Sequence, residues 1–165
     1  MTVNVQRLEK LALALDAYQA SPGAADFDLE NWTSVKKRRG GFLWLREVEC
    51  GTAACAVGLA CLSGIFADEG LSHYRLDDGG IVPIFGDTEN WQAVQAFFGL
   101  TRKQSHRLFD SDKYEISKGP IAAAAVARRI RATVNKSLKA RKPKAPQRTD
   151  PVVAEIKAKA LEGVS

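Results

Sequence analysis

The stretch that decides the fold is residues 49–62, which read Glu49-Cys50-Gly51-Thr52-Ala53-Ala54-Cys55-Ala56-Val57-Gly58-Leu59-Ala60-Cys61-Leu62. Small or apolar residues continue almost without interruption to position 66, and the hydroxyl of Thr52 can accept a hydrogen bond from the first turn of a helix. A helix that is apolar on all sides is buried on all sides. Residues 53–66 therefore predict a central helix that Thr52 caps and on which the other elements pack closely.

Four further helices are expected from the spacing of apolar residues. The first spans residues 3–20, and the second begins at Asp87 or Thr88 and ends at Gly99. A capping box over residues 101–104 opens a short third helix, and Pro120 stands in the first turn of the last one. The predicted fold class is mainly α, a compact helical domain around the buried central helix, with a small β-hairpin and a basic C-terminal tail.

The remaining segments between the helices are a loop and the hairpin. The segment after the first helix is interpreted as a loop that Phe27, Leu29 and Trp32 pin to the core. Two apolar runs around the Asp-Asp-Gly-Gly turn at residues 77–80 predict the β-hairpin. Because proline cannot donate a backbone hydrogen bond, Pro83 predicts that the second strand lies at a sheet edge.

Length and composition limit the classes of protein to which the chain can belong. Its 165 residues, 45% hydrophobic and 26% charged, suit one helical core domain over residues 1–135. Residues 136–165 are expected to form a basic, proline-containing linker and a short amphipathic helix. No apolar run reaches the roughly 20 residues that a membrane helix needs, and no signal peptide is recognised. Three closely spaced cysteines do not resemble a disulfide framework, so we expect a cytoplasmic protein without a membrane partner.

Basic residues are concentrated near the C-terminus. Residues 128–148 hold nine of them and no acid, so the rest of a chain whose net charge is +5 sums to −4. A second basic run precedes Gly40. Such clusters predict contacts with nucleic acid or with an acidic protein surface, and the alternative is a solvated, solubilising role. The predicted contact residues are Lys36, Lys37, Arg38, Arg39, Arg128, Arg129, Arg131, Lys136, Lys139, Arg141, Lys142, Lys144 and Arg148.

A second contact is predicted in residues 150–165. Asp150 and Pro151 are typical of a helix start. The apolar residues that follow, among them Val153, Ile156 and Ala160, form a short amphipathic segment. This segment is expected to dock on a protein partner as a helix laid into a groove.

Cys50 is the candidate nucleophile. If the central helix begins at Thr52, its N-terminus lowers the pKa of a thiol just before it. His73 or His106 would then serve as the base, with Asp77, Asp78 or Asp110 to orient it. A purely structural role is the favoured interpretation of all three cysteines, because few polar residues follow Cys50.

Other chemistry has weaker signals. The cysteines are separated by four and five residues, which is not the spacing of a zinc site. Gly51 and Thr52 could hold an anion at the start of the central helix, with plain capping as the favoured alternative. The two short helices joined at Gly99 and Leu100 resemble half of a helix-turn-helix, although ordinary helix packing is favoured. We expect no cofactor and no metal.

The residues Cys50-Gly51-Thr52-Ala53-Ala54-Cys55-Ala56-Val57-Gly58 resemble a Cys-Gly-Thr-x-x-Cys-x-x-Gly signature of small uncharacterised proteins of bacteriophages and bacteria. The resemblance covers roughly residues 5–130 and extends to the segments around Trp32, Phe97 and Tyr114. Relatives often carry Trp or His directly after the motif glycine, where this chain has Leu59. The resemblance implies an intracellular, phage-derived origin, and it brings no catalytic residues with it.

Three functions follow from these observations. The first is a non-enzymatic binding protein whose basic C-terminal region contacts nucleic acid or an acidic partner. The second is a cysteine-dependent enzyme that uses Cys50. The third is a structural or inhibitory phage protein that docks through its C-terminal helix. The binding protein is favoured over the enzyme, because a nucleophile normally lies among convergent polar groups and few follow Cys50.

Overall fold

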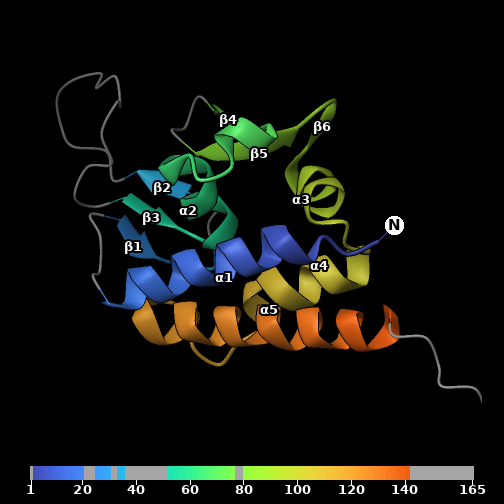
Figure 1. Ribbon diagram of the computed structural model, residues 1–165. Coiled ribbons are helices and arrows are strands. Elements are labelled where there is room, and N and C mark those ends of the chain that lie inside the picture. Colours follow the sequence, from blue (N-terminus) through green and yellow to red (C-terminus); the bar gives the residue numbers. More distant parts are fainter. Residues whose placement is uncertain (1, 21–24, 31–32, 36–51, 77–79, 142–165) are drawn as a thin grey trace, which may run out of the picture.

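The computed structural model describes residues 2–20, 25–30, 33–35, 52–76 and 80–141 (Figure 1). Within these ranges the chain is mainly helical, with five α-helices and two small three-stranded sheets. The mainly α fold class with a small antiparallel sheet is therefore confirmed. No helix among the described residues is both long and apolar enough to cross a membrane.

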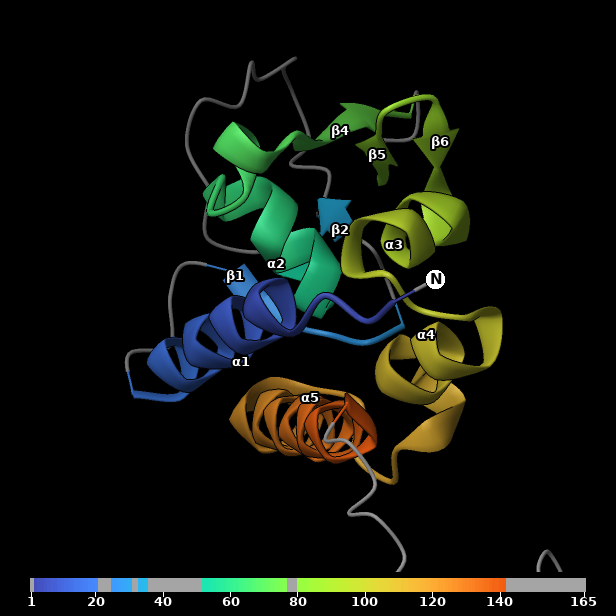
Figure 2. The ribbon, with the colours of Figure 1, turned by 45° about the vertical axis from the view of Figure 1, so that its right-hand side comes forward.

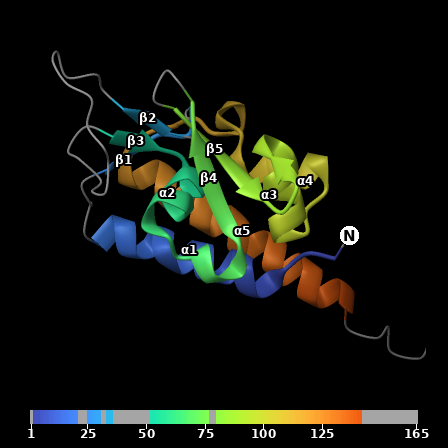
Figure 3. The ribbon, with the colours of Figure 1, turned by 90° about the horizontal axis from the view of Figure 1, so that it is seen from above.

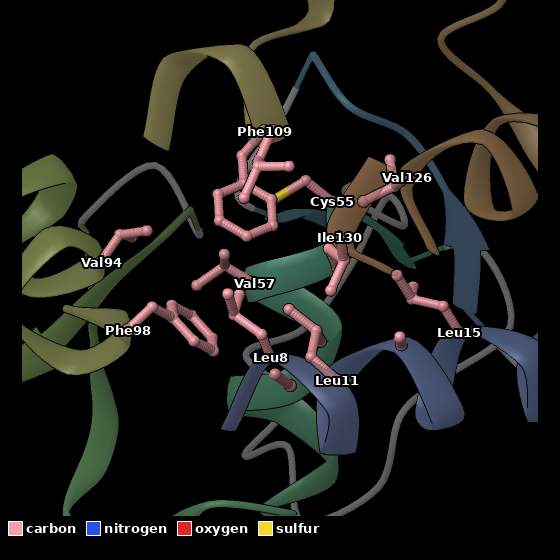
Figure 4. Packing of buried hydrophobic residues seen from close by; sticks show 14 of the residues in the cluster. Leu8, Leu11, Leu15, Cys55, Val57, Val94, Phe98, Phe109, Val126 and Ile130 are labelled. Atoms are coloured by element: carbon pink, nitrogen blue, oxygen red, sulfur yellow. The ribbon is translucent and has the colours of Figure 1, made fainter. Parts of the chain in front are cut away.

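The longest helices form one layer of the fold. Helices α1 (Val5–Ala20) and α5 (Gly119–Arg141) lie side by side and run in opposite directions (Figures 1 and 3). Helical spacing puts one row of apolar residues of each helix on the face toward the other, and that row is buried. Figure 4 shows Leu8, Leu11 and Leu15 of α1 with Val126 and Ile130 of α5 in this core.

Helix α2 (Ala56–Ser63) is the central helix, but it begins later than expected. Residues Thr52–Ala54 form strand β3, and Cys55 is the N-cap, with its Sγ 3.4 Å from the backbone nitrogen of Gly58. Burial of the helix is confirmed at Ala56, Val57, Gly58, Ala60 and Cys61. The prediction that Thr52 caps a helix is wrong, because residues 52–54 bond to two other strands instead.

Those partners are strands β1 (Ala25–Phe27) and β2 (Thr33–Val35). Strand β3 lies between them, parallel to β1 and antiparallel to β2. The interpretation of this part of the chain as a loop is therefore wrong. The anchoring role of Phe27 and Leu29 is confirmed, since both side chains are buried, and Trp32 lies outside the described residues.

The predicted hairpin is confirmed. Strands β4 (Leu71–Arg75) and β5 (Ile81–Phe85) pair antiparallel, and His73 is opposite Pro83. The placing of β5 at an edge is wrong, because β6 (Thr88–Glu89) pairs with its other side. Strand β6 reaches only Ile84 and Phe85, so the missing N–H of Pro83 costs no bond on that side.

Helices α3 (Asn90–Phe98) and α4 (Arg102–Phe109) follow the second sheet. Helix α3 begins at Asn90 rather than at Asp87 or Thr88, because Thr88 belongs to β6. Gly99 ends α3 in a left-handed conformation, and the capping box of Thr101 and Gln104 opens α4, both as predicted. The two helices and the first sheet lie at opposite ends of the α1–α5 layer (Figures 1 and 3).

The last helix extends beyond the predicted domain boundary at residue 135. Pro120 lies in the first turn of α5 as expected, and Val134 is its last buried residue. The helix nevertheless continues to Arg141. Six of the nine basic residues of the 128–148 block therefore lie on a helix of the domain rather than in a tail. The boundary itself stays a prediction.

Candidate functional site

Five Lys and Arg side chains line one open surface pocket of about 900 Å³. The pocket lies where α4, the short 3-10 helix η2 (Ser111–Lys113) and α5 meet, a region seen in Figure 2 where α4 lies close to α5. Asp110 is the one acidic residue that lines it. The lining residues are Arg102, Lys103, His106, Arg107, Asp110, Lys113 and Arg129.

Helix α4 supplies four of these residues because its two faces differ in chemistry. Ser105, Leu108 and Phe109 are buried in the core, and the hydroxyl of Ser105 donates to the carbonyl of Arg102 at 2.9 Å. Residues four apart lie on the same side of a helix, so Lys103 and Arg107 share a face, as do Arg102 and His106. The side chains of Arg102, Lys103 and Arg107 are exposed. The buried side of α4 thus fixes the helix with its basic residues toward solvent.

Arg129 of α5 is held in one position. Its guanidinium lies 3.9 Å from the centre of the Tyr114 ring, and Nη1 donates to the carbonyl of Arg107 at 3.2 Å. A second bond runs from Nη2 to the carbonyl of Lys113. The Tyr114 hydroxyl donates to the carbonyl of Leu108, and its burial raises the pKa of Tyr114 to about 12 although the Arg129 charge opposes this. Arg129 and Tyr114 therefore satisfy carbonyls at the C-terminus of α4, where a cation is favoured.

His106 is oriented from two sides. Its ring stacks on Trp91 of α3 at a centroid distance of 4.2 Å and an interplanar angle of 19°. Its Nδ1 lies 3.3 Å from Oδ2 of Asp110, while Oδ1 of Asp110 accepts a bond from the amide of Asp112 at 3.1 Å. Because a carboxylate only accepts, Nδ1 is the protonated nitrogen and Nε2 is left for a ligand or solvent.

The charge state of Asp110 fits this arrangement. Partial burial acts to raise the pKa of its carboxyl. The bonds from the Asp112 amide and from His106, together with the Lys113 and His106 charges, outweigh burial and lower the pKa. The pocket therefore contains one carboxylate among five cations, which leaves it strongly positive near neutral pH.

The pocket lies in the positive half of a chain with unequal halves. Residues 90–141 contain eleven Lys and Arg and three Asp and Glu. The described residues before them, within 2–20, 25–30, 33–35, 52–76 and 80–89, contain three basic and nine acidic residues. The basic C-terminal region predicted from sequence is thus part of a larger positive region that also includes α4.

The predicted basic residues of α5 have different environments. Arg128, Lys136 and Lys139 are exposed, whereas Arg131 donates to both carboxylate oxygens of Asp16 on α1. Lys136 follows Arg129 by seven residues, about two turns, so it lies on the same face of α5. Arg141 is the last residue of α5.

Several predicted site residues lie outside the described part of the chain. They include the nucleophile candidate, the first basic run, the end of the second basic block and the segment expected to dock on a partner. These residues are Cys50, Lys36, Lys37, Arg38, Arg39, Lys142, Lys144, Arg148, Val153, Ile156 and Ala160.

Two arguments about the central stretch need correction. The first described residues after Cys50 form strand β3, and α2 begins only at Ala56. The helix N-terminus that was expected to lower the pKa of Cys50 is therefore not at Thr52. For the same reason, the anion site that was the less favoured interpretation of Gly51 and Thr52 has lost its basis.

The candidate bases are separated in the structure. His73 lies on β4, and burial together with the charge of Arg75 lowers its pKa. His106 does pair with Asp110, which was one of the expected base–orienter pairs.

Burial of Cys55 and Cys61 raises their pKa values to about 11 and about 12, in keeping with structural thiols. Within the described ranges, no group of three or more His, Cys, Asp or Glu is placed to hold a metal ion.

Four residues of the pocket are not among the site residues predicted from the sequence. These are Arg102, Lys103, Arg107 and Lys113. The available signal was the four-residue spacing that puts basic side chains opposite the apolar residues Leu108 and Phe109. The meeting of α4 with Arg129 depends on tertiary structure and had no local signal.

Comparison of the chain with protein-family models, with curated proteins and with solved structures gave no match. The resemblance to the phage and bacterial signature stays a prediction. Any function is therefore argued from the site alone.

Proposed function

We propose that this protein is a non-enzymatic nucleic-acid-binding protein that contacts phosphates through one basic face. The basic face consists of Arg102, Lys103, Arg107, Lys113, Arg129 and Lys136. The observation that carries the proposal is the pocket in which five of these cations meet a single carboxylate. Neutralising phosphates with Lys and Arg releases counterions, which supplies most of the affinity of sequence-independent binding.

Two features favour nucleic acid over an acidic protein surface. Helices α3 and α4 are joined by three residues, Gly99, Leu100 and Thr101, which is the connection found in helix-turn-helix motifs. In such motifs the second helix meets DNA with its N-terminal residues, and here these are Arg102 and Lys103. Arginine and lysine dominate phosphate contacts.

Sequence preference is expected to be weak. The side chain of Gln104, which could otherwise read a base edge, is bonded to the backbone nitrogen of Thr101 at 2.9 Å. The other exposed side chains at the start of α4 are cations, which suit phosphates. We include Arg128, Lys139 and the basic residues beyond α5 as additional contacts. A cytoplasmic location and a phage-derived origin belong to the same proposal.

The test measures binding and its salt dependence for the full chain. Fluorescence anisotropy follows labelled duplex DNA, single-stranded DNA and RNA of one sequence from about 50 to 200 mM salt. The wild type is expected to bind all three and to weaken steeply with salt. The double substitution Lys103→Gln and Arg107→Gln removes two phosphate contacts. The slope of the logarithm of the binding constant against the logarithm of the salt concentration should therefore become less steep by about 1.8 for duplex DNA.

A matched control removes the same charge from the acidic half. Lys10→Gln with Arg75→Gln lowers the net charge by two but changes no residue of the basic face, so the slope should stay at the wild-type value. Equal losses in both double variants would show that only net charge matters and would contradict the proposed face. No binding at 50 mM salt would contradict nucleic-acid binding, and tighter binding to polyglutamate would assign an acidic protein partner instead.

A further inference from the structure

We propose that the pocket on α4, η2 and α5 takes a terminal phosphate, the phosphomonoester at the end of a nucleic-acid strand, in preference to an internal phosphodiester. The inference rests on the proposed function, since it names the part of the nucleic acid that the basic face recognises. Its starting point is the way in which the cations are arranged around one pocket.

The charge of the pocket favours a terminal phosphate. An internal phosphodiester carries one negative charge, whereas a phosphomonoester carries about 1.5 to 2 near pH 7 and has three strong acceptor oxygens. The pocket contains five cations and one carboxylate. That excess is larger than a single phosphodiester can neutralise. A phosphomonoester dianion is therefore attracted to the pocket more strongly than a phosphodiester is.

The convergence of the cations on one pocket also favours an end group. The lining residues come from α4, from residues 110–113 and from α5, so their charges approach the pocket from separate segments. Cations that follow a continuous strand would instead form a row along a groove. The volume of about 900 Å³ lies within the range of small-ligand sites and suits a single end group with its nucleotide.

A donor group of the pocket, the guanidinium of Arg129, is fixed before the ligand arrives. Arg129 uses two N–H groups on the carbonyls of Arg107 and Lys113, and a guanidinium has five. The guanidinium that carries the other three is held against the Tyr114 ring, whose centre is 3.9 Å away. The His106 ring, which also lines the pocket, is held by Trp91 and Asp110. Fixed donors reduce the entropy that is lost on binding.

The experiment compares ends on one strand. Three internally labelled single-stranded DNA oligonucleotides of identical sequence carry a 5′-phosphate, a 3′-phosphate or hydroxyls at both ends. The full chain should bind one phosphorylated form at least about tenfold more tightly than the hydroxyl form, as one extra charge-assisted hydrogen bond predicts. In Lys113→Gln this preference should disappear, and binding of the hydroxyl form should weaken only by the loss of one phosphate contact.

Lys139→Gln is the matched control, because it removes an exposed lysine of α5 that does not line the pocket. It should keep the preference, and the melting temperatures of both variants should match the wild type. Equal affinity for all three strands, with steep salt dependence, would overturn this inference but leave the proposed function standing. No binding to any strand would overturn both.

Two further outcomes bear on the location and the source of the phosphate. A preference that survives in both Lys113→Gln and Arg107→Gln would show that the end is recognised elsewhere and would overturn the inference. A nucleoside monophosphate serves as competitor. If it binds more tightly than the phosphorylated strand, the pocket serves free nucleotides and the strand-end proposal is wrong.

Discussion

Gly99 fixes the turn between α3 and α4. Its φ of 63° is in the left-handed region, and the N-terminal segment packs directly against it. The amide of Asn4 donates to the carbonyl of Phe98 at 2.9 Å. A Cβ at position 99 would collide with the carbonyl oxygen of Thr2 and lie 3.2 Å from the nitrogen of Asn4. The N-terminal segment therefore holds the connection that orients α4.

Gly99→Ala is predicted to destabilise the protein more than Gly86→Ala. Gly86 has a φ of 56°, and a Cβ there would meet no atom within 4 Å, so alanine suffers only the left-handed conformation, about 1–2 kcal/mol. At Gly99 the collision with Thr2 adds about 1–3 kcal/mol. Urea unfolding measures both changes. Equal changes would contradict the close approach of the N-terminal segment.

The thiols provide a second prediction. Burial raises the pKa values of Cys55 and Cys61 to about 11 and about 12, so almost no thiolate exists at pH 7. Iodoacetamide at pH 7 should leave both unlabelled in the native protein and label both in urea, as mapped by mass spectrometry. We expect Cys50 to react no faster than glutathione. Native labelling of Cys55 or Cys61 would contradict their burial, and rapid labelling of Cys50 alone would favour the cysteine-enzyme alternative.

At the scale of elements, an ion-pair cluster ties α1 to the short 3-10 helix η1 (Ala67–Glu69). Glu69 accepts bonds from Arg7 at 2.8 Å and from Lys10 at 3.0 Å. Arg7 also donates to the carbonyl of Phe97 at 2.7 Å, and its guanidinium carbon lies 4.0 Å from the centre of the Phe97 ring. The cluster thereby connects α1 with the segment after α2 and with the end of α3.

Glu69→Gln is predicted to lower the free energy of unfolding at pH 7 by about 0.5–1 kcal/mol, the usual size for partly exposed pairs. Hydrogen bonds from Arg7 and Lys10 lower the pKa of Glu69 in the folded state. Its contribution is therefore present above the unfolded pKa of about 4.3 and is lost as pH falls through the folded pKa. The difference between variant and wild type should vanish in acid.

The control for this prediction is Glu9→Gln, which removes the same charge from the exposed surface of α1 without changing the cluster. Urea unfolding from pH 7 into acid measures all three proteins. A difference between Glu69→Gln and the wild type that persists unchanged at the lowest pH would contradict the ion-pair account.

Local signals predicted the elements that local chemistry determines. Three signals each act within a few residues: the capping box at Thr101, the left-handed Gly99 and the Asp-Gly type turn of the hairpin. The structure contains the capping box, the left-handed Gly99 and the two paired strands that the turn predicts. Strand β3 could not be predicted in this way, because residues 52–54 become a strand only through pairing with β1 and β2.

The same difference between local and long-range contacts holds for the candidate site. The spacing of His106 and Asp110 predicts their contact, since side chains four apart on a helix are neighbours. The position of Arg129 next to the end of α4 results from packing between segments about twenty residues apart. The pocket could therefore not be predicted from the sequence, and of its five cations only Arg129 is among the predicted contact residues.

At the scale of the whole molecule, the separation of charge matters more than the net value of +5. Eleven basic residues lie within 90–141, against three in the described residues before them. A molecule whose charge is unevenly distributed is oriented by the field of a polyanion before contact, and salt screens this effect within about 10 Å at 0.1 M. The basic face should therefore be the first part to meet a nucleic acid.

The measurement that tests this account most directly is an amide chemical-shift map of the full chain titrated with single-stranded DNA at low salt. We predict that the largest changes fall in residues 102–113 and 129–136, which contain the basic face. We also predict that Lys103→Gln with Arg107→Gln reduces these changes together. Changes that centre instead on α1 or on the β4–β5 hairpin, or no changes at all, would contradict this account.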